Sequence, residues 1–501
     1  MGPPAARAVP VSLDREGSAL SARASTAELT EALNEAPMSM FHLRTVLTAG
    51  MGFLTDAYDL FIIGTAMTLI AKVWHPSAAM TGLVSSTALI AAFLGAFVFG
   101  RLADVFGRKS VYGIEAAIMV VGAIASAFSP SIIWLIIFRF ILGIGIGGDY
   151  PMSAVLMSEF ANRKDRGRLV TLVFSMQALG LLAGPIVALT LLASGISPDI
   201  AWRLMLGLGA LPAAGVIYFR RTMPESPRYL ARVRGDTEAA SASMADYSGG
   251  AVKVSAAKEP RVRLSFMQFI SNPRTLITLL GTAGTWFVFD YAYYGNSIST
   301  PLVLKDVAPH ATPLQSAAWT LILFALFAVP GYVLSFMNMD RIGHRRLQII
   351  GFMVMGLAFL SIGVIPGLTH VVLPFILVYG VSYLFAEFGP NCTTFCLSAE
   401  LYPVSARTTG HGMSAGIAKF GAFLGVFLFP LLNHALGLSG TLTLTCVLAF
   451  VGVLLTLVLP EPAGRSLEEV SGEEEVVRRS DSVAPPRGSA AGAAGAAGAA
   501  G

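Results

Sequence analysis

Residues 132–157 read IIWLIIFRFILGIGIGGDYPMSAVLM, an apolar run that contains Gly147-Gly148-Asp149-Tyr150-Pro151-Met152-Ser153 near its end. A helix needs about 20 mostly apolar residues to cross the hydrocarbon core of a bilayer. A carboxylate such as Asp149 is costly at that depth and is typical of an ion or proton path. The stretch therefore predicts a membrane-spanning helix with a functional acid.

The composition of the whole chain indicates a membrane protein. Of its 501 residues, 54% are hydrophobic and 13% are charged, and the mean hydropathy is +0.68. A soluble domain averages about a quarter charged residues. We predict an all-α membrane protein with twelve transmembrane helices in two six-helix bundles, at 46–72, 80–103, 110–129, 131–157, 168–194, 201–219, 274–299, 313–337, 347–367, 371–398, 405–434 and 438–459.

The distribution of Lys and Arg predicts the topology. Basic residues gather after the second, fourth, sixth and eighth spans, whereas the opposite loops hold little beyond Lys72 and Lys305. By the positive-inside bias, both termini are cytoplasmic, in a plasma membrane or a bacterial inner membrane. Basic loops in this setting are a topology signal, so no nucleic-acid partner is expected. The expected divisions are a cytoplasmic tail at 1–45, bundles at 46–219 and 274–460, a cytoplasmic linker with short interfacial helices at 220–273, and a disordered cytoplasmic tail at 461–501.

The two predicted bundles repeat each other in sequence. The run Asp104–Lys109 recurs as Asp340–Arg345, and Pro224-Glu225 recurs as Pro460-Glu461 at the same offset. Such matches indicate duplication of a six-helix unit, whose two copies can rock about a site held between them. Charged residues of the repeated loops would then act as a gate that pairs in one state and separates in the other. The predicted gating residues are Asp104, Arg108, Glu159, Arg166, Asp340, Glu400 and Arg407.

Acidic and aromatic residues in two spans suggest a site for a proton and a ligand. Asp56 and Asp59 are three apart, hence on one helix face, and at least one is expected to hold a proton. Trp286, Asp290 and Tyr294 recur every four residues and form one stripe. That stripe offers donors and an acceptor to a single ligand.

Several further polar residues lie in apolar runs. Gln177 can both donate and accept, and Asn391 follows a Gly389-Pro390 break that can open the helix backbone to a cavity. Lys419 requires a carboxylate partner or an anionic substrate. Arg139 is interpreted as a support of the fold or a partner of an acid, and Glu387 has no assigned role.

The inventory suits dihydrogen phosphate, which has acceptor oxygens and hydroxyl donors. Asp290 could accept from such a hydroxyl, whereas sulfate at neutral pH has none to offer. We see no nucleophile–base pair and no metal-ligand spacing, so neither an enzyme nor a cofactor or metal is expected. Cys392 and Cys396 lie on one helix face without a second ligand pair, and with Cys446 they are interpreted as packing residues.

These motifs together resemble a known family. Gly100-x-x-x-Asp104-x-x-Gly107-Arg108-Lys109 is similar to the signature loop of the major facilitator superfamily, and the Gly147–Ser153 run to the hallmark of its phosphate:proton symporters. Thr55–Phe61, Thr285-Trp286 with Asp290, Phe388–Asn391, and His411-Gly412 before Lys419 also match. The resemblance implies that Asp56 and Asp149 handle protons and that Lys419 compensates charge. It implies a phosphate site of Tyr150, Gln177, Trp286, Asp290, Tyr294 and Asn391.

The chain departs from the family pattern at a few positions. Glu387 stands where a neutral residue is usual, Met152 replaces Leu, and Ala418 replaces Gly. The second loop has His344 for Arg and Phe336 for Gly. The expected function is secondary active import of inorganic phosphate with protons by alternating access. The alternatives are the same fold carrying a glycerophosphodiester or another organic anion, and a phosphate sensor that signals through its linker and tails. The residues do not indicate an oligomeric state.

Overall fold

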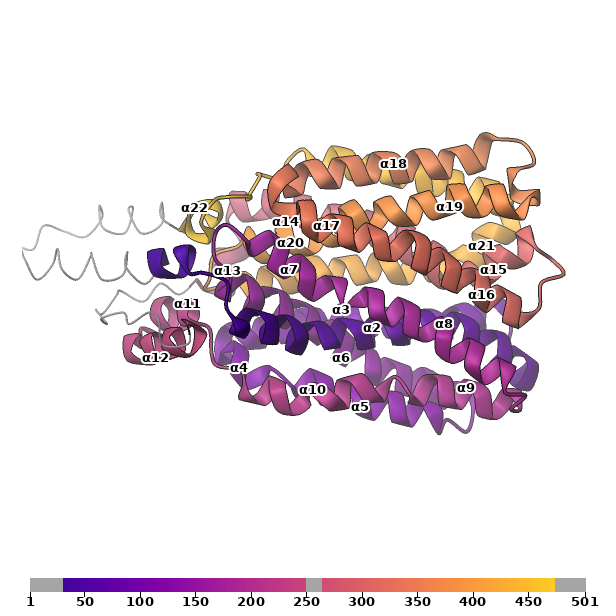
Figure 1. Cartoon of the computed structure of the whole chain (residues 1–501), viewed down its shortest axis with the longest axis horizontal. Coiled ribbons are helices and arrows are strands. Elements are labelled where there is room, and N and C mark those ends of the chain that lie inside the picture. Colours follow the sequence, from indigo (N-terminus) through magenta and orange to yellow (C-terminus); the bar gives the residue numbers. More distant parts are fainter. Residues whose placement is uncertain (1–29, 249–263, 474–501) are drawn as a thin grey trace, which may run out of the picture.

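The computed structural model describes residues 30–248 and 264–473, and within those ranges the chain is helical and has no strand. The long helices lie side by side along one direction (Figure 1). Those of the first half are α2 (Met40–Trp74), α3 (Ala78–Phe106), α5 (Ile114–Ala127), α6 (Ile132–Phe160), α7 (Arg166–Ser175), α8 (Gln177–Ala193), α9 (Pro198–Gly207) and α10 (Ala210–Thr222). Those of the second half are α14 (Pro273–Ile298), α16 (Pro313–Leu323), α17 (Val329–Ile342), α18 (His344–Val364), α19 (Val372–Ala386), α20 (Cys392–Glu400) and α21 (Arg407–Thr456).

These helices make twelve spans. Ten helices in the described ranges are long and apolar enough to cross a membrane, and one of them is the 50-residue α21. Gly437 interrupts α21 with φ 68° and ψ 172°, so α21 supplies two spans. The remaining span is α14, which is as long as its neighbours but carries the polar stripe of Trp286, Asp290 and Tyr294. The twelve predicted spans correspond to these helices.

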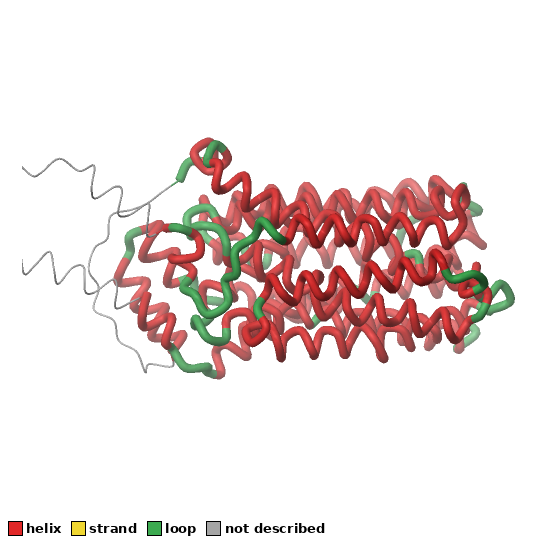
Figure 2. The backbone as a smooth tube through the Cα atoms, turned by 90° about the horizontal axis from the view of Figure 1, so that it is seen from above, coloured by secondary structure: helices red, strands yellow, loops and turns green. Residues whose placement is uncertain are grey.

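Several of the shorter elements gather at one end of the bundle, which we call the linker end. They are α4 (Arg108–Val111), α11 (Pro227–Tyr229), η1 (Leu230–Arg234), α12 (Thr237–Ser248), α13 (Phe266–Ile270) and α22 (Leu467–Ser471). Figure 2 shows that most loops and turns lie at the two ends of the molecule. The two halves meet along their length, where α3 packs on α21 and α8 packs on α16.

The helices differ from the predicted segments at three places. The first span begins at Met40 rather than 46, because Ser39 and His42 form a capping box that starts α2 earlier. The fifth span breaks at Met176, between α7 and α8. Residues 461–473, which we expected to be disordered, include α22, whose Leu467 and Val470 are buried. The rest of the two predicted tails, 1–29 and 474–501, lies outside the described residues.

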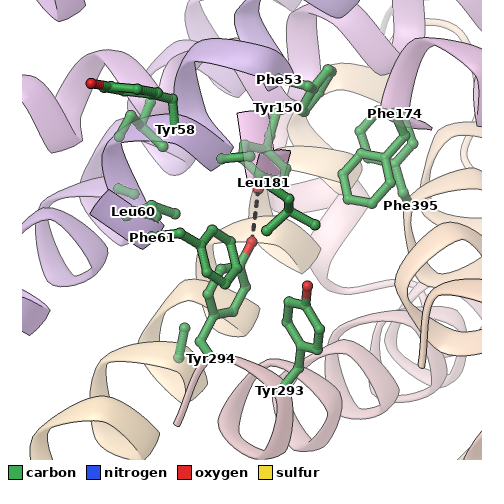
Figure 3. Close-up of a cluster of buried hydrophobic side chains, with 14 of the residues drawn as sticks. Phe53, Tyr58, Leu60, Phe61, Tyr150, Phe174, Leu181, Tyr293, Tyr294 and Phe395 are labelled. Atoms are coloured by element: carbon green, nitrogen blue, oxygen red, sulfur yellow. Dashed lines mark hydrogen bonds between the residues drawn. The ribbon is translucent and has the colours of Figure 1, made fainter. Parts of the chain in front are cut away.

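Aromatic side chains from both halves gather in the buried cluster that Figure 3 shows. Phe174 on α7 stacks on Phe395 of α20, with their ring centroids 4.4 Å apart, and Phe53 packs edge-on against Phe395 at 5.1 Å. This layer lies on the linker-end side. On the other side, Phe61 of α2 packs against Phe324 at 5.5 Å. The polar residues described next are therefore enclosed.

Candidate functional site

Three helices of the first half bring together one part of the predicted site. Tyr150 Oη on α6 donates to Asp56 Oδ2 on α2 at 2.6 Å. Gln177 Nε2 on α8 donates to the same carboxylate oxygen and to Tyr150 Oη, each at 3.2 Å. All three side chains are buried. Asp56 is thus an acceptor whose Oδ1 has no hydrogen-bond partner among the described residues.

The second half contributes a buried cation and its partners. Lys419 Nζ on α21 donates to Asp290 Oδ2 at 3.0 Å and to Tyr294 Oη at 3.2 Å, both on α14. The ammonium also lies 4.4 Å from the ring centroid of Tyr150 and 4.3 Å from that of Tyr294. A buried charge requires such compensation. The sequence required a carboxylate or an anion for Lys419, and Asp290 is the carboxylate.

The two parts touch at the centre of the molecule. Tyr150 Oη and Tyr294 Oη are 3.4 Å apart, one from each half, as the dashed line in Figure 3 shows. The Trp286 ring lies 5.9 Å from that of Tyr150. Asn391 reaches the first half indirectly, because its Nδ2 donates to Tyr332 Oη at 2.9 Å, and Tyr332 donates to Gln177 Oε1 at 2.9 Å. The seven predicted substrate-binding residues therefore lie around one buried polar cluster.

Asp149 and Asp59 do not join that cluster. The Asp149 side chain points in a different direction from that of its neighbour Tyr150. It pairs with Arg220 of α10 at 2.8 Å and accepts a hydrogen bond from Ser153 Oγ at 2.6 Å. Arg220 also pairs with Glu115 of α5 at 3.0 Å. The result is a buried triad of two carboxylates on one guanidinium.

Asp59 follows Asp56 on α2 and lies beside Arg139 of α6. Arg139 Nη2 donates to the backbone carbonyl of Asp59 at 3.4 Å, and neither carboxylate oxygen has a hydrogen-bond partner among the described residues. Among the described residues Arg139 therefore bonds to the backbone of Asp59 and forms no ion pair with its carboxylate.

The predicted gating residues form reciprocal ion pairs between the halves near the linker end. Arg166 of the first half pairs with Glu400 of the second at 3.0 Å, and Arg407 of the second half pairs with Glu159 of the first at 3.3 Å. Arg108 joins Glu159 at 3.0 Å. All five side chains are buried. These pairs hold the halves together at this end in the described state.

The repeated loop acids cap helices of the opposite half. Asp104 Oδ2 accepts from the backbone N–H of Thr409, in the first turn of α21, at 2.7 Å. Asp340 accepts from the N–H groups of Gly167 and Arg168, in the first turn of α7, at 3.0 and 2.7 Å. A carboxylate is favourable at a helix N-terminus because it meets unpaired N–H groups and the positive dipole end. The sequence repeat is therefore also a repeat of cross-half contacts.

A second pair of repeated acids caps helices within each half. Glu225 accepts from the N–H of Lys109 at 3.2 Å, and Glu461 accepts from the N–H groups of His344 and Arg345 at 3.0 Å. Burial raises the pKa of Glu225. Burial also disfavours the charge of Glu461, but the hydrogen bond and the positive charge of His344 lower its pKa overall. Pro224-Glu225 and Pro460-Glu461 thus have equivalent structural places.

The segment with α22 is tied to the linker and to the first half. Arg228 Nε donates to Glu468 Oε1 at 3.1 Å, and Arg228 Nη2 donates to Asn34 Oδ1 at 2.8 Å. Arg232 pairs with Glu473 at 2.7 Å. Burial opposes the charge of Glu468, but Arg228 lowers its pKa to about 2. At the linker end, ion pairs therefore connect segments that are far apart in the sequence.

Sequence reasoning missed three residues of these clusters. Glu115 lies in an apolar run, so the burial cost that singled out Asp149 could have identified it. Arg220 was counted among the basic residues of the linker. Tyr332 had no signal, because a single Tyr in an apolar span is usual. In the described ranges no group of three His, Cys, Asp or Glu side chains could hold a metal, and the three cysteines are free and buried.

A multi-pass bundle of twelve helices in two repeated halves, with a buried polar cluster between them and paired loops at one end, is the architecture of a membrane carrier. The xylose–proton symporter XylE, solved with 6-bromo-6-deoxy-D-glucose, superposes with a TM-score of 0.72 at 20% identity. The alignment covers 87% of this chain and 99% of that one. The fold is therefore that of the major facilitator superfamily.

Sequence comparison defines the family within that fold. Residues 45–473 match the family described as sugar (and other) transporter. Inorganic phosphate transporter 1-6 of Oryza sativa subsp. japonica is 35% identical, over 92% of this chain and 97% of its own length. Inorganic phosphate transporter 1-1 of Arabidopsis thaliana is 34% identical, over 89% and 97%. The chain belongs to the sugar (and other) transporter family, whose members are membrane carriers and not enzymes, and its resemblance to inorganic phosphate transporters is confirmed.

Proposed function

We propose that this protein imports inorganic phosphate together with protons by alternating access. The observation that carries the proposal is the buried cluster of Lys419, Asp290, Tyr294, Tyr150 and Gln177 between the halves. It supplies a cation, hydroxyl and amide donors, and a carboxylate acceptor, which a protonated tetrahedral anion requires. The names of the two phosphate transporters with which it aligns support this substrate.

The charges of the cluster give a reason for proton coupling. With Asp56 and Asp290 both ionised, Lys419 leaves the site with one excess negative charge, which would repel an anion. A proton on Asp56 removes that excess. Proton and anion then favour the same closed arrangement, as coupling requires. The Oδ1 of Asp56, which has no hydrogen-bond partner in the described part of the chain, is a place where the proton can bind.

We assign the remaining parts of the chain by the same proposal. The linker end is the cytoplasmic side, and both termini lie there, in a plasma membrane or a bacterial inner membrane. Two bundles at 46–219 and 274–460, joined by the linker at 220–273, rock about the site. The cross-half pairs Arg166–Glu400 and Arg407–Glu159 hold the cytoplasmic side closed and separate for release. The Asp149–Arg220–Glu115 triad lies between the site and that side and provides a route for proton exit.

The test is uptake of radiolabelled phosphate by the purified protein in liposomes under an inward proton gradient. Uptake is expected to fall as external pH rises and when a protonophore is added, and arsenate is expected to compete where sulfate does not. Uptake that is independent of pH would refute proton coupling. If phosphate is not taken up and a glycerophosphodiester competes for binding, the substrate is an organic anion. If phosphate binds but is not transported, the protein is better explained as a phosphate sensor.

Asp290→Asn tests the selection of phosphate over sulfate. The amide still accepts a hydrogen bond, but it loses the charge and offers donors where phosphate also donates. We expect the preference for phosphate to fall. Unchanged discrimination would exclude a role for Asp290 in selecting the protonated anion.

A further inference from the structure

Glu387 is a buried carboxyl group without a cationic partner in the described ranges. It begins η4 (Glu387–Asn391), the π-helical segment between α19 and α20, and its exposed fraction is 0%. No Lys, Arg or His nitrogen of the described residues lies within 4.0 Å of it, whereas Asp290 has Lys419 at 3.0 Å. The titratable side chains that face it from the helices packed around it are Tyr293, Tyr332, Tyr383 and Cys392, and neither Tyr nor Cys can carry a positive charge.

Burial without a counter-ion determines which form of Glu387 the closed protein favours. An ionised carboxylate in an apolar interior costs far more than a neutral one, and a bound proton removes that cost. In the open states water can reach the space between the halves and solvate the charge. Proton affinity at this position therefore changes between the states of the cycle, which is the property a coupling acid must have.

Hydrogen bonds connect Glu387 to Asp56 across the two halves. Asn391 Nδ2 donates to Glu387 Oε2 at 2.5 Å and to Tyr332 Oη at 2.9 Å. Tyr332 donates to Gln177 Oε1 at 2.9 Å, and Gln177 Nε2 donates to Asp56 Oδ2 at 3.2 Å. Tyr332 and Gln177 each accept a hydrogen bond on one side and donate one on the other, whereas Asn391 donates through Nδ2 on both sides. Both carboxyl groups are therefore acceptors at the two ends of one hydrogen-bonded chain.

The same bonds link the proton to the substrate site. An ionised Glu387 holds the Asn391 amide by a charge-assisted hydrogen bond, which is stronger than a neutral one. Protonation weakens this bond and frees the Asn391 donor for an anion. It also removes a negative charge near that anion. Protonation of Glu387 and anion binding at Asn391 therefore favour each other.

We propose that Glu387 is a second proton-carrying acid of this transporter, linked to Asp56 through Asn391, Tyr332 and Gln177. It binds a proton from the external side, remains neutral while the halves are closed, and releases the proton when the cytoplasmic side opens. Each cycle then moves one proton more than the Asp56 site alone would move. The inference rests on the proposed proton-coupled function.

The first experiment measures protons moved per phosphate in liposomes, with an entrapped pH dye and radiolabelled phosphate in parallel. Glu387→Gln is expected to transport with one proton fewer per phosphate than the wild type, and with a shallower dependence on external pH. Asp306→Asn is the matched control, because it neutralises an exposed acid of the same half, bonded to Asn433 at 2.6 Å. Its ratio should equal that of the wild type. Equal ratios in Glu387→Gln and wild type would overturn the proposal.

The second experiment needs no substrate. Infrared difference spectra of the purified protein between pH 5 and pH 8 report protonated carboxyl groups directly. We expect a carboxyl band that disappears in Glu387→Gln, and also in Glu387→Asn, which serves if the first variant does not fold. The midpoint of this band should shift in Asp56→Asn, and Tyr332→Phe should abolish that shift.

The two experiments separate the two ideas. If the wild type carries no phosphate but the Glu387 band titrates, the substrate assignment fails and the proton site stands. If phosphate is carried and the spectra show no titrating band lost on substitution of Glu387, the proton site fails and the transport function stands. A band that titrates without responding to Asp56→Asn would overturn the link through Tyr332.

Discussion

Glu159 is the residue whose loss should most weaken the closed linker end, because it serves two guanidinium groups at once. Its Oε1 lies 3.0 Å from Arg108 Nη2 and 3.3 Å from Arg407 Nη1, and all three side chains are fully buried. Glu159→Gln keeps the shape and removes the charge. Both guanidinium groups then remain buried in the closed state, whereas opening allows water to solvate them.

The magnitude follows from the geometry. Removing one partner of a buried ion pair costs about 3–5 kcal/mol. We take about 3 kcal/mol, the lower end, since Arg108 keeps Asp104 at 3.2 Å and Arg407 keeps Glu473 at 3.5 Å. At about 1.4 kcal/mol for each factor of ten, the population open at the linker end should rise about a hundredfold.

Cys396 is a natural reporter of this opening. Its Sγ lies 3.3 Å from Thr171 Oγ1 across the boundary between the halves, and it is buried. In a background in which Cys392 and Cys446 are Ala, a membrane-impermeant maleimide applied from the cytoplasmic side should label Cys396 in proportion to the open population. We expect Glu159→Gln to raise the labelling rate up to about a hundredfold.

The matched control is Glu35→Gln. Glu35 pairs with Arg163 at 2.5 Å, but their side chains are 59% and 43% exposed. An exposed pair contributes at most about 1 kcal/mol, so labelling should change by less than about fivefold. A rate for Glu159→Gln no higher than that of the control would refute the reasoning that the buried pairs hold this side closed.

Three further predictions concern single sites. Glu468→Gln should lower the thermal unfolding midpoint at pH 7, because Arg228 loses its buried carboxylate. The folded pKa of Glu468 is about 2, below its usual 4.5. The difference in midpoint between variant and wild type should therefore persist at pH 5 and vanish only as pH falls through about 2. Gly52→Ala should destabilise the protein in detergent, measured by size-exclusion chromatography after heating, because its Cβ would lie 1.7 Å from Asp149 Oδ2. Tyr332→Phe should lower phosphate uptake about thirtyfold, because its hydroxyl makes two buried hydrogen bonds that contribute about 1 kcal/mol each.

Each of these predictions has a matched control in the chain. Glu469→Gln removes an acid whose side chain is 53% exposed, and it should leave the unfolding midpoint unchanged. Gly215→Ala adds a Cβ with nothing within 4 Å, so the protein should tolerate heating as the wild type does. Tyr218→Phe removes a hydroxyl from a side chain that is 72% exposed, and uptake should not change. An effect in any control equal to that of its partner would contradict the corresponding explanation.

The fold was predictable because the signals for it are local. Apolar runs and the repeat of Asp104–Lys109 as Asp340–Arg345 are read directly along the chain. The repeat also predicted that the loop charges would pair. It could not predict that each acid caps a helix of the other half, because equal spacing within the two halves is compatible with contacts inside one half or between both.

The arrangement of the site was less accessible to sequence reasoning. Asp149 and Tyr150 are adjacent, and successive residues of a helix point about 100° apart, so they face different surroundings. Tyr150 reaches Asp56 at the centre, whereas Asp149 pairs with Arg220. Nothing local indicates which of the two faces the centre, because the answer depends on the position of α10. Tyr332 was missed for the same reason, since its role exists only through its partners.

The division of charges between the halves explains why closure, proton and anion depend on one another. The first half contributes Asp56 to the centre. The second contributes Lys419 with Asp290, and also Glu387, which has no counter-ion among the residues that the structure describes. Neither half alone encloses an anion, and bringing the halves together removes the water that would otherwise solvate each acid. If the halves close while the acids are ionised, excess negative charge is buried. If they close with protons bound but no anion, the hydrogen-bond donors of the cluster have no anion to bind. A carrier built in this way closes most readily when both the proton and the anion are bound.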